Sequence, residues 1–206
     1  MKKHIPVATI IIGRLAESGN CTMRTLDKLK RTASKEAGVQ LTTNTDLISA
    51  YASLVASGAM KANDDIESLL TVKPMRSESG VAIVTVLTMP FPCPGRCVYC
   101  PDEERMPKSY IASEPAAARA LALQFDPYTQ VRRRIEMLEG NGHPSGKIEL
   151  IIKGGTWSSY PVDYQQWFVA ECFKAMNETG VMERIPSEVN SENPYSRFNG
   201  EEKAQW

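Results

Sequence analysis

The stretch VAIVTVLTMPFPCPGRCVYC, residues 81–100, decides the fold, because it joins an apolar run directly to a loop rich in cysteine. Residues 81–88 are mostly apolar and β-branched, which is typical of a strand buried on both faces of a parallel sheet. Cys93, Cys97 and Cys100 follow in a C-x3-C-x2-C arrangement, with prolines and a glycine around them. Because α/β folds place their functional residues at the carboxyl ends of parallel strands, we expect a functional site in this loop.

The segments after the loop alternate between helical and strand patterns. Helical patterns at residues 113–123 and 129–143 precede a second apolar run, KIELIIKGG at residues 147–155, which predicts another buried strand. A further helical pattern covers residues 161–180. The order strand, loop, helix, strand, loop, helix predicts β/α units and therefore an α/β protein.

The residues before the strand predict a small helical domain. Apolar residues recur at helical spacing between residues 22 and 70, and Asn44 or Thr45 is the expected N-cap of a helix there. The apolar run within residues 1–19 is short and contains Arg14, so it predicts a first strand or a buried helix rather than a secretory signal. We expect three parts: a helical domain at residues 1–72, β/α units at 73–178, and a polar tail, loop or disordered, at 179–206.

Basic residues concentrate in the first fifty residues, although the whole chain is neutral, with 24 basic and 24 acidic residues. Four of them interleave with the apolar positions of the first predicted helix: Lys28, Lys30, Arg31 and Lys35. Such a cluster is compatible with a polyanionic partner and equally with a solvated helix face. Charge alone leaves both interpretations open.

No apolar stretch approaches the roughly 20 residues that a membrane-spanning helix needs. We therefore expect a cytoplasmic protein without a membrane partner, in a compartment where thiols stay reduced. Under those conditions, clustered cysteines indicate a metal site or catalysis more than disulfides.

Two kinds of metal site are compatible with three thiolates. Structural zinc takes four ligands, but the remaining candidates (Cys21, Cys172, His4 and His143) lie far away in the sequence, and Cys172 falls on an apolar helix face. Three thiolates can instead hold three irons of a 4Fe-4S cluster and leave the fourth iron open for a substrate or cofactor. The spacing favours the iron–sulfur cluster, and structural zinc is the alternative.

The motifs also resemble those of a known family. An aromatic residue before the last cysteine, here Tyr99, is similar to the signature of radical S-adenosylmethionine (SAM) enzymes, and a second strand that ends in two glycines is similar to their SAM-binding motif. Four stretches in order resemble the catalytic subunit of Elongator, a family that modifies the wobble uridine of tRNA: KPMRSESGVAIVTVLTMPFPCPGRCVYCP (73–101), PKSYIASEPAAARA (107–120), FDPYTQVRRRIEMLEGNGH (125–143) and KIELIIKGGTWSSYP (147–161). The helical domain before them resembles the family's tRNA-binding domain more loosely.

This resemblance implies roles for the matched residues, although it leaves the catalytic side chains unassigned. Three cysteines would ligate the 4Fe-4S cluster: Cys93, Cys97 and Cys100. The open iron would take the amino and carboxylate groups of SAM, and Tyr99 would lie near its adenine. Three residues after the second strand would line the methionine end of SAM: Gly154, Gly155 and Thr156.

The resemblance also implies a tRNA surface. Four side chains of the helical domain would contact tRNA phosphates: Lys28, Lys30, Arg31 and Lys35. The arginines of the VRRR stretch, residues 131–134, are a further candidate for this surface, with a solvated helix face as the equal alternative.

The implied reaction is the reductive cleavage of SAM to a deoxyadenosyl radical. In the family, this radical takes hydrogen from the methyl group of acetyl-CoA, the product adds to C5 of the uracil, and hydrolysis leaves a carboxymethyl group.

The chain departs from the family at Met89, Asp102 and Glu103, where lysine and two glycines are usual, and its cysteine loop is one residue shorter.

The family contains further β/α units and an acetyltransferase-like domain that binds acetyl-CoA, for which these 206 residues have no counterpart. We therefore expect the first β/α units of a partial TIM-like barrel, truncated. The chain would be a fragment, a split gene product that needs a second polypeptide for the rest, or a degenerate copy. The implied function is that of the N-terminal half of an acyltransferase that acts on tRNA. The alternatives are a non-catalytic tRNA-binding fragment or split-enzyme subunit, and a structural zinc protein.

Overall fold

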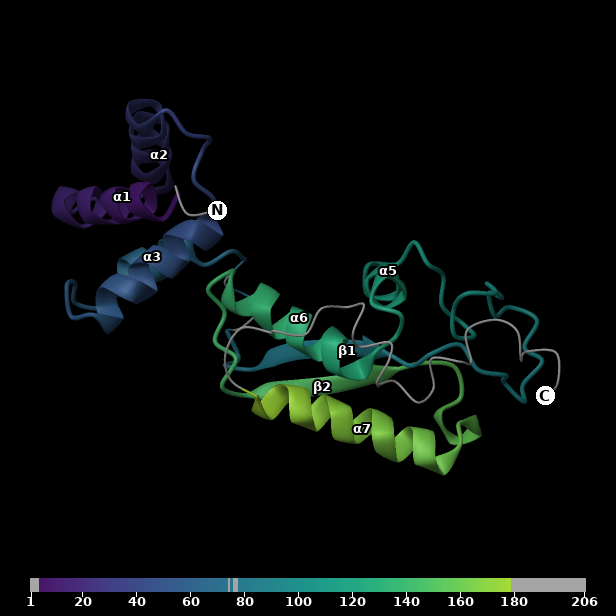
Figure 1. Ribbon diagram of the computed structural model, residues 1–206. Coiled ribbons are helices and arrows are strands. Elements are labelled where there is room, and N and C mark those ends of the chain that lie inside the picture. The colour runs from purple at the N-terminus through teal and green to yellow at the C-terminus, as the bar shows by residue number, and fades with distance from the viewer. Residues whose placement is uncertain (1–3, 74, 76–77, 179–206) are drawn as a thin grey trace. The chain divides into compact units, whose positions relative to one another are not determined.

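The computed structural model describes residues 4–73, 75 and 78–178 (Figure 1). The chain forms two compact units. The first contains the chain up to Ala82 together with Met137–Lys147, and the second contains Ile83–Glu136 together with the chain from Ile148 onward. The expected tail at 179–206 lies outside the described residues, and the expected three-part division stays a prediction.

The first unit is built from four helices: α1 (His4–Ser18), α2 (Met23–Ala37), α3 (Asn44–Ala56) and α4 (Asp64–Leu70). Helix α1 packs against α2 and α3, and α3 packs against α4. Apolar side chains from all four helices have no exposed surface, among them Ile11, Leu26, Leu47 and Ile66. Of the two structures expected for the first residues, the buried helix is therefore the one observed.

Local hydrogen bonds explain where these helices begin and end. Thr43 is the N-cap of α3 and forms a capping box with Asp46, because the Asp46 N–H donates to Thr43 Oγ1 and the Thr43 N–H donates to Asp46 Oδ2, each at 3.1 Å. The cap therefore lies one residue before Asn44, the nearer of the two expected positions. Helix α2 ends at Gly38, whose φ of 62° is left-handed and suits glycine.

The second unit carries most of a two-stranded parallel sheet, formed by β1 (Ala82–Leu87) and β2 (Ile148–Lys153). The parallel register follows from two hydrogen bonds: the Ala82 N–H donates to the Lys147 carbonyl at 2.8 Å, and the Thr88 N–H donates to the Lys153 carbonyl at 2.9 Å. The other elements are α5 (Pro115–Ala122), α6 (Pro127–Glu139), the 3-10 helix η2 (Trp157–Ser159) and α7 (Val162–Asn177). With seven α-helices and two strands among the described residues, the α/β class is confirmed.

The two strands differ in burial. Strand β1 is mostly buried, and Val84, Val86 and Leu87 have no exposed surface. Strand β2 is partly exposed along its whole length, so the expectation of a second buried strand is wrong. The physical reason is that, within the described chain, β2 pairs with β1 alone and no strand lies on its other edge.

A side chain of α6 occupies the opposite edge of β1. Gln130 Nε2 donates to the Leu87 carbonyl, and Gln130 Oε1 accepts the Leu87 N–H, each at 2.9 Å. Both backbone groups of Leu87 are thereby satisfied without a neighbouring strand.

Helices α6 and α7 lie alongside the two strands (Figure 1). Arg132 of α6 is only 5% exposed, and its guanidinium donates to the carbonyls of Ala175 at 3.4 Å and Glu178 at 2.7 Å. A cation is favourable at this position because carbonyls without helical partners gather at the C-terminus of α7. Both interpretations of the VRRR stretch, a tRNA surface and a solvated helix face, are therefore wrong for Arg132. None of the described helices is long and apolar enough to cross a bilayer.

Candidate functional site

A buried polar network holds the end of β1, where the cysteine loop starts. Thr88 Oγ1 lies 2.8 Å from Tyr160 Oη, and Tyr160 Oη donates to the Met89 carbonyl at 2.7 Å. The Met89 N–H donates to Tyr164 Oη at 3.1 Å. Burial raises the pKa of Tyr160 to about 12, so its phenol stays protonated and keeps its donor. This network positions the first residue of the loop.

The two glycines after β2 have different surroundings. A Cβ on Gly154 would lie 2.1 Å from Thr88 Oγ1, so only glycine fits beside the end of β1. A Cβ on Gly155 would lie 3.5 Å from the Cβ of Lys108, which is an ordinary van der Waals distance. Gly154 is therefore required for the approach of the two strand ends, whereas Gly155 borders Lys108 without a steric requirement for glycine.

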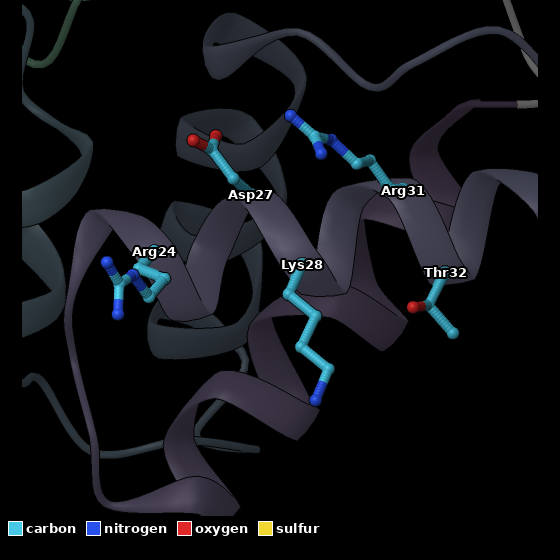
Figure 2. A pocket seen from close by; sticks show the side chains of 5 residues that line it. All are labelled: Arg24, Asp27, Lys28, Arg31 and Thr32. Carbon is cyan, nitrogen blue, oxygen red and sulfur yellow. The ribbon is translucent and has the colours of Figure 1, made fainter.

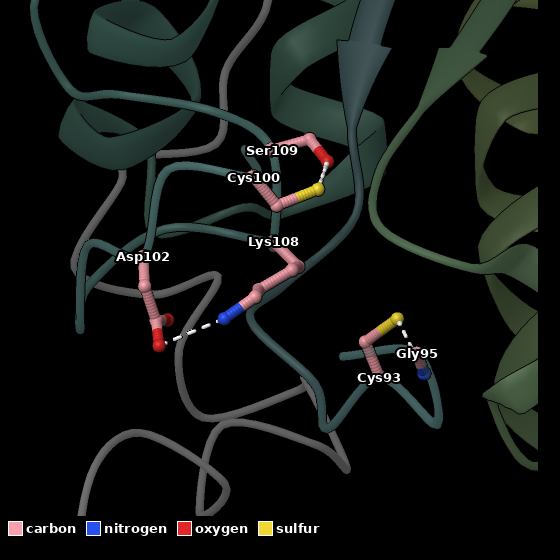
Figure 3. Close-up of polar contacts among 6 residues, drawn as sticks. All are labelled: Cys93, Gly95, Cys100, Asp102, Lys108 and Ser109. Atoms are coloured by element: carbon pink, nitrogen blue, oxygen red, sulfur yellow. Dashed lines mark hydrogen bonds and ion pairs between the residues drawn. The ribbon is translucent and has the colours of Figure 1, made fainter. Parts of the chain in front are cut away.

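Cys93 and Cys97 lie on either side of the turn at Gly95. A Cβ on Gly95 would be 3.5 Å from Cys93 Sγ and 3.7 Å from Cys97 Sγ, so both sulfurs face this residue. Thr156 Oγ1 lies 3.2 Å from Cys93 Sγ. The Gly95 N–H donates to the same sulfur at 3.4 Å (Figure 3). These contacts, with Thr156 contributing most, lower the pKa of the Cys93 thiol and favour its thiolate.

The third cysteine lies against the turn that contains Lys108. Cys100 Sγ lies 3.0 Å from Ser109 Oγ, and Lys108 Nζ lies 2.7 Å from Asp102 Oδ2 (Figure 3). The hydrogen bond to Asp102 and, to a smaller extent, the negative charges of Asp102, Cys100 and Cys93 raise the pKa of Lys108. Lys108 is thus a cation close to two of the three cysteines.

A cavity of about 280 Å³ opens beside these groups. Its wall includes Cys93 and Gly95 from the cysteine turn, Asp102 and Lys108 from the next turns, and Phe91. The volume is close to the lower end of the range for small-molecule sites, about 300–1,000 Å³. The cavity therefore combines one thiol, that of Cys93, with charges of both signs and an apolar wall.

The donor set suits an iron–sulfur cluster. Cys93, Cys97 and Cys100 are free and at least partly exposed, and soft thiolates are the ligands of such clusters. Hydrogen bonds to the sulfurs, such as the one from the Gly95 N–H, tune clusters of this kind. In the part of the chain that the structure describes, no three ligating side chains are yet gathered closely enough to hold a metal ion, and the ligand assignment stays a prediction.

The remaining sequence candidates lie in varied environments. Tyr99 is 89% exposed on the cysteine loop, and its place near an adenine stays a prediction. Cys172 is fully buried in α7, and burial raises the pKa of its thiol to about 12, which confirms the expected core role. His143 is buried in the turn after α6.

Basic side chains form a stripe along α2. Arg24, Lys28 and Arg31, together with Asp27 and Thr32, line an open hollow of about 650 Å³ (Figure 2). A spacing of four and then three residues keeps side chains on one face of a helix, and Lys35 continues the series by one further turn. The basic stripe is therefore Arg24, Lys28, Arg31 and Lys35.

Lys30, which belongs to the predicted phosphate-contacting set, lies off the basic stripe. Its Nζ donates to Asn44 Oδ1 at 2.6 Å within the helical unit, and partial burial lowers its pKa. Arg24 was missed by the sequence analysis, although the helical period that relates it to Lys28 is visible in the sequence. Contact of any of these residues with tRNA stays a prediction.

Comparison with known proteins places these features in a family context. No family model matches the chain. The chain is 50% identical over 116 residues to the tRNA uridine(34) acetyltransferase of Methanocaldococcus infernus, a match that covers 53% of the chain and 22% of that protein. It is 34% identical over 181 residues to Elongator complex protein 3 of Schizosaccharomyces pombe, covering 82% of the chain and 32% of that protein. The human Elongator complex protein 3 is 38% identical over 119 residues, covering 52% of the chain and 22% of that protein.

These matches confirm the resemblance to the catalytic subunit of Elongator that the four motifs indicated. The chain spans about a fifth to a third of the length of the curated relatives that it matches. Those relatives are named for the modification of a tRNA uridine and for a subunit of a complex.

Proposed function

We propose that this chain is the N-terminal portion of a radical SAM enzyme that helps to install a carboxymethyl group at C5 of the wobble uridine of tRNA. The observation that carries the proposal is the contact between the two motifs, where Cys93 Sγ lies 3.2 Å from Thr156 Oγ1. The cysteine loop after β1 and the glycine loop after β2 thereby border one small region. The relatives' names, which specify a tRNA uridine, support the substrate class.

The three cysteines would hold the 4Fe-4S cluster, and the cavity beside Cys93 would receive part of SAM. The cluster, when bound, supplies the electron that cleaves SAM. The chain's own residues prepare the site: the Gly95 N–H and the Thr156 hydroxyl orient Cys93, and the Ser109 hydroxyl orients Cys100. Phe91 packs on Tyr160 with ring centroids 4.9 Å apart and helps to keep water from the cavity wall that it forms.

The basic stripe on α2 would bind the tRNA backbone. Its four side chains are exposed and recur along one helix face, which suits successive phosphates. Acetyl-CoA would be the co-substrate. The domain that binds it and the remaining barrel strands would be supplied by further chain segments or by a second polypeptide, because the relatives are several times longer. A cytoplasmic location belongs to the same proposal.

Anaerobic reconstitution with iron and sulfide tests the cluster. We expect a brown protein with visible absorbance, and loss of that absorbance when all three cysteines are replaced by alanine. Cys21→Ala is the matched control and should retain the absorbance. A wild-type protein that binds only a single zinc ion, or no metal, would contradict the proposal and favour the zinc alternative or the non-catalytic one.

A second candidate function is a non-catalytic tRNA-binding fragment, which the partly exposed strand β2 favours, because the sheet lacks further strands in the described chain. The two functions differ in one product. Incubation of reconstituted protein with SAM and dithionite should release deoxyadenosine if the site is catalytic, and none if the chain only binds tRNA.

A further inference from the structure

The structure assigns to Lys108 a role that the family motifs do not: we propose that it is a positioning residue that joins the cysteine loop to the glycine loop and sets the electrostatic potential at the three cysteines. The electrostatic part of this inference rests on the proposed function, because it takes the cysteines as cluster ligands. The positioning part concerns the metal-free chain and stands independently.

Lys108 touches both loops at once. Its Nζ lies 2.7 Å from Asp102 Oδ2, two residues after Cys100, and its backbone N and O lie 3.6 and 3.8 Å from the position of a Cβ on Gly155. The Lys108 side chain is 25% exposed, whereas that of Asp102 is 76% exposed. The lysine is thus the inner member of the pair, and the aspartate covers it from the solvent side.

The two residues after Lys108 fix it in place. Ser109 has a φ of 79°, which is uncommon for a residue other than glycine, and its hydroxyl contacts Cys100. Tyr110 interacts with the backbone of Gly154. A strained backbone persists where surrounding contacts hold it, and such positions cluster at functional sites. Ser109 therefore contacts the cysteine loop, Tyr110 contacts the glycine loop, and Lys108 contacts both.

Lys108 lies close enough to Cys93 and Cys100 for their charges to act on it, while its ammonium group is turned toward Asp102 (Figure 3). It lines the cavity together with Cys93 and Gly95, and Figure 3 shows Cys93 and Cys100 on either side of its side chain. Arg105 lies in the same segment, but its charge is in solvent. Its side chain is 72% exposed, and its Nη2 lies 3.7 Å from Glu103 Oε1. A solvent-exposed ion pair contributes little to stability, and solvent and salt screen its effect on a nearby charge.

Opposite charges on Lys108 and Asp102 have opposite consequences for a reduced cluster. A fixed cation beside the sulfurs stabilises the more negative, reduced state and raises the midpoint potential, whereas a carboxylate lowers it. Asp102 places a carboxylate 2.7 Å from the Lys108 ammonium, so the cation is balanced by an anion of the same segment.

The redox test uses the reconstituted full chain and a potentiometric titration followed by the visible absorbance. Lys108→Gln should shift the midpoint to more negative potential, Asp102→Asn should shift it to more positive potential, and Lys108→Arg should stay close to wild type. Arg105→Gln removes an equal charge from the same segment and should shift the midpoint less than Lys108→Gln does. Equal shifts in Lys108→Gln and Arg105→Gln, or no shift in Lys108→Gln, would overturn the electrostatic role.

Hydrogen exchange of the metal-free chain tests the positioning role without a cluster. Lys108→Gln loses the ion pair with Asp102 that fixes residue 108 beside Gly155. It should therefore speed amide exchange about two- to fivefold in both loops, near residues 95–102 and 154–156, with exchange in α1–α4 unchanged. Arg105→Gln should leave the glycine loop at the wild-type rate. Unchanged exchange at 154–156 in Lys108→Gln would overturn the positioning role. Failure of the wild-type chain to take up iron would instead contradict the proposed function, so the two failures are distinguishable.

Discussion

The basic stripe on α2 and the cysteine loop after β1 are both candidate binding surfaces, but they are built differently. The stripe arises from one helix, in which the period of the backbone alone brings Arg24, Lys28 and Arg31 to one face. The loop has no regular structure, and contacts from distant segments hold its sulfurs, such as Thr156 beside Cys93. The first surface is local in origin and the second is tertiary, so substitutions should affect them in different ways.

The largest expected effect concerns the tertiary surface. Gly154→Ala places a Cβ where Thr88 Oγ1 lies 2.1 Å away, so either the Thr88 side chain leaves its contact with Tyr160 or the two strand ends separate. We expect a loss of about 3 kcal/mol in the free energy of unfolding, the upper end of the usual cost of overpacking, measured by urea denaturation.

Gly155→Ala is the matched control for that substitution. Its Cβ would meet Lys108 at 3.5 Å, so we expect a change within about 0.5 kcal/mol. Equal effects of the two substitutions would show that the close approach of the strand ends does not depend on Gly154.

A second substitution examines the polar network under the loop. Tyr160→Phe removes the hydroxyl that joins Thr88 to the Met89 carbonyl and leaves buried polar groups without their partner. We expect a loss of about 1–3 kcal/mol and lower iron uptake on reconstitution. Tyr99→Phe, which changes an 89% exposed ring in the same loop, should alter neither quantity, and a comparable loss there would contradict the tertiary origin of the site.

The local surface is examined through tRNA binding. Replacing Arg24, Lys28 and Arg31 together by glutamine should weaken tRNA binding about tenfold or more at low salt. It should also flatten the slope of log affinity against log salt by about 0.7–0.9 for each lost phosphate contact. Fluorescence anisotropy across a salt series measures both quantities.

Lys30→Gln tests whether tRNA binding depends on the basic stripe or on the total positive charge of α2. It removes one charge from the same helix, but Lys30 already donates to Asn44, so the salt slope should stay at its wild-type value. A reduction in slope equal to that of Arg31→Gln would show that position on the helix face is irrelevant.

The smallest expected effect tests whether a substitution in the helical unit leaves the cysteine loop unaffected. Thr43→Ala removes the side-chain cap of α3 and should lower the stability of the helical unit by about 1 kcal/mol. Iron uptake by the cysteine loop should remain unchanged, and a change there would contradict the independence of the two surfaces. Thermal unfolding followed by circular dichroism, together with the iron content, measures both.

Regular periods and spacings account for what the sequence predicted correctly. The apolar run before Cys93 predicted β1, the helical periods predicted the helical unit, and the motif order predicted the resemblance that the comparisons confirm. The same rules failed where burial depends on other segments. Strand β2 has the composition of a buried strand but is partly exposed, and Arg132 looks like a surface residue but is buried at the end of α7.

The sequence by itself determined the α/β class, the place of the three cysteines after the first strand and the basic character of α2, because these depend on residues close together in the chain. Only the tertiary structure decided that Lys30 turns away from the basic stripe, that Gly154 rather than Gly155 requires the absence of a side chain, and that Lys108 lies beside two cysteines. These features depend on distances between segments far apart in the chain, which the order of residues does not specify.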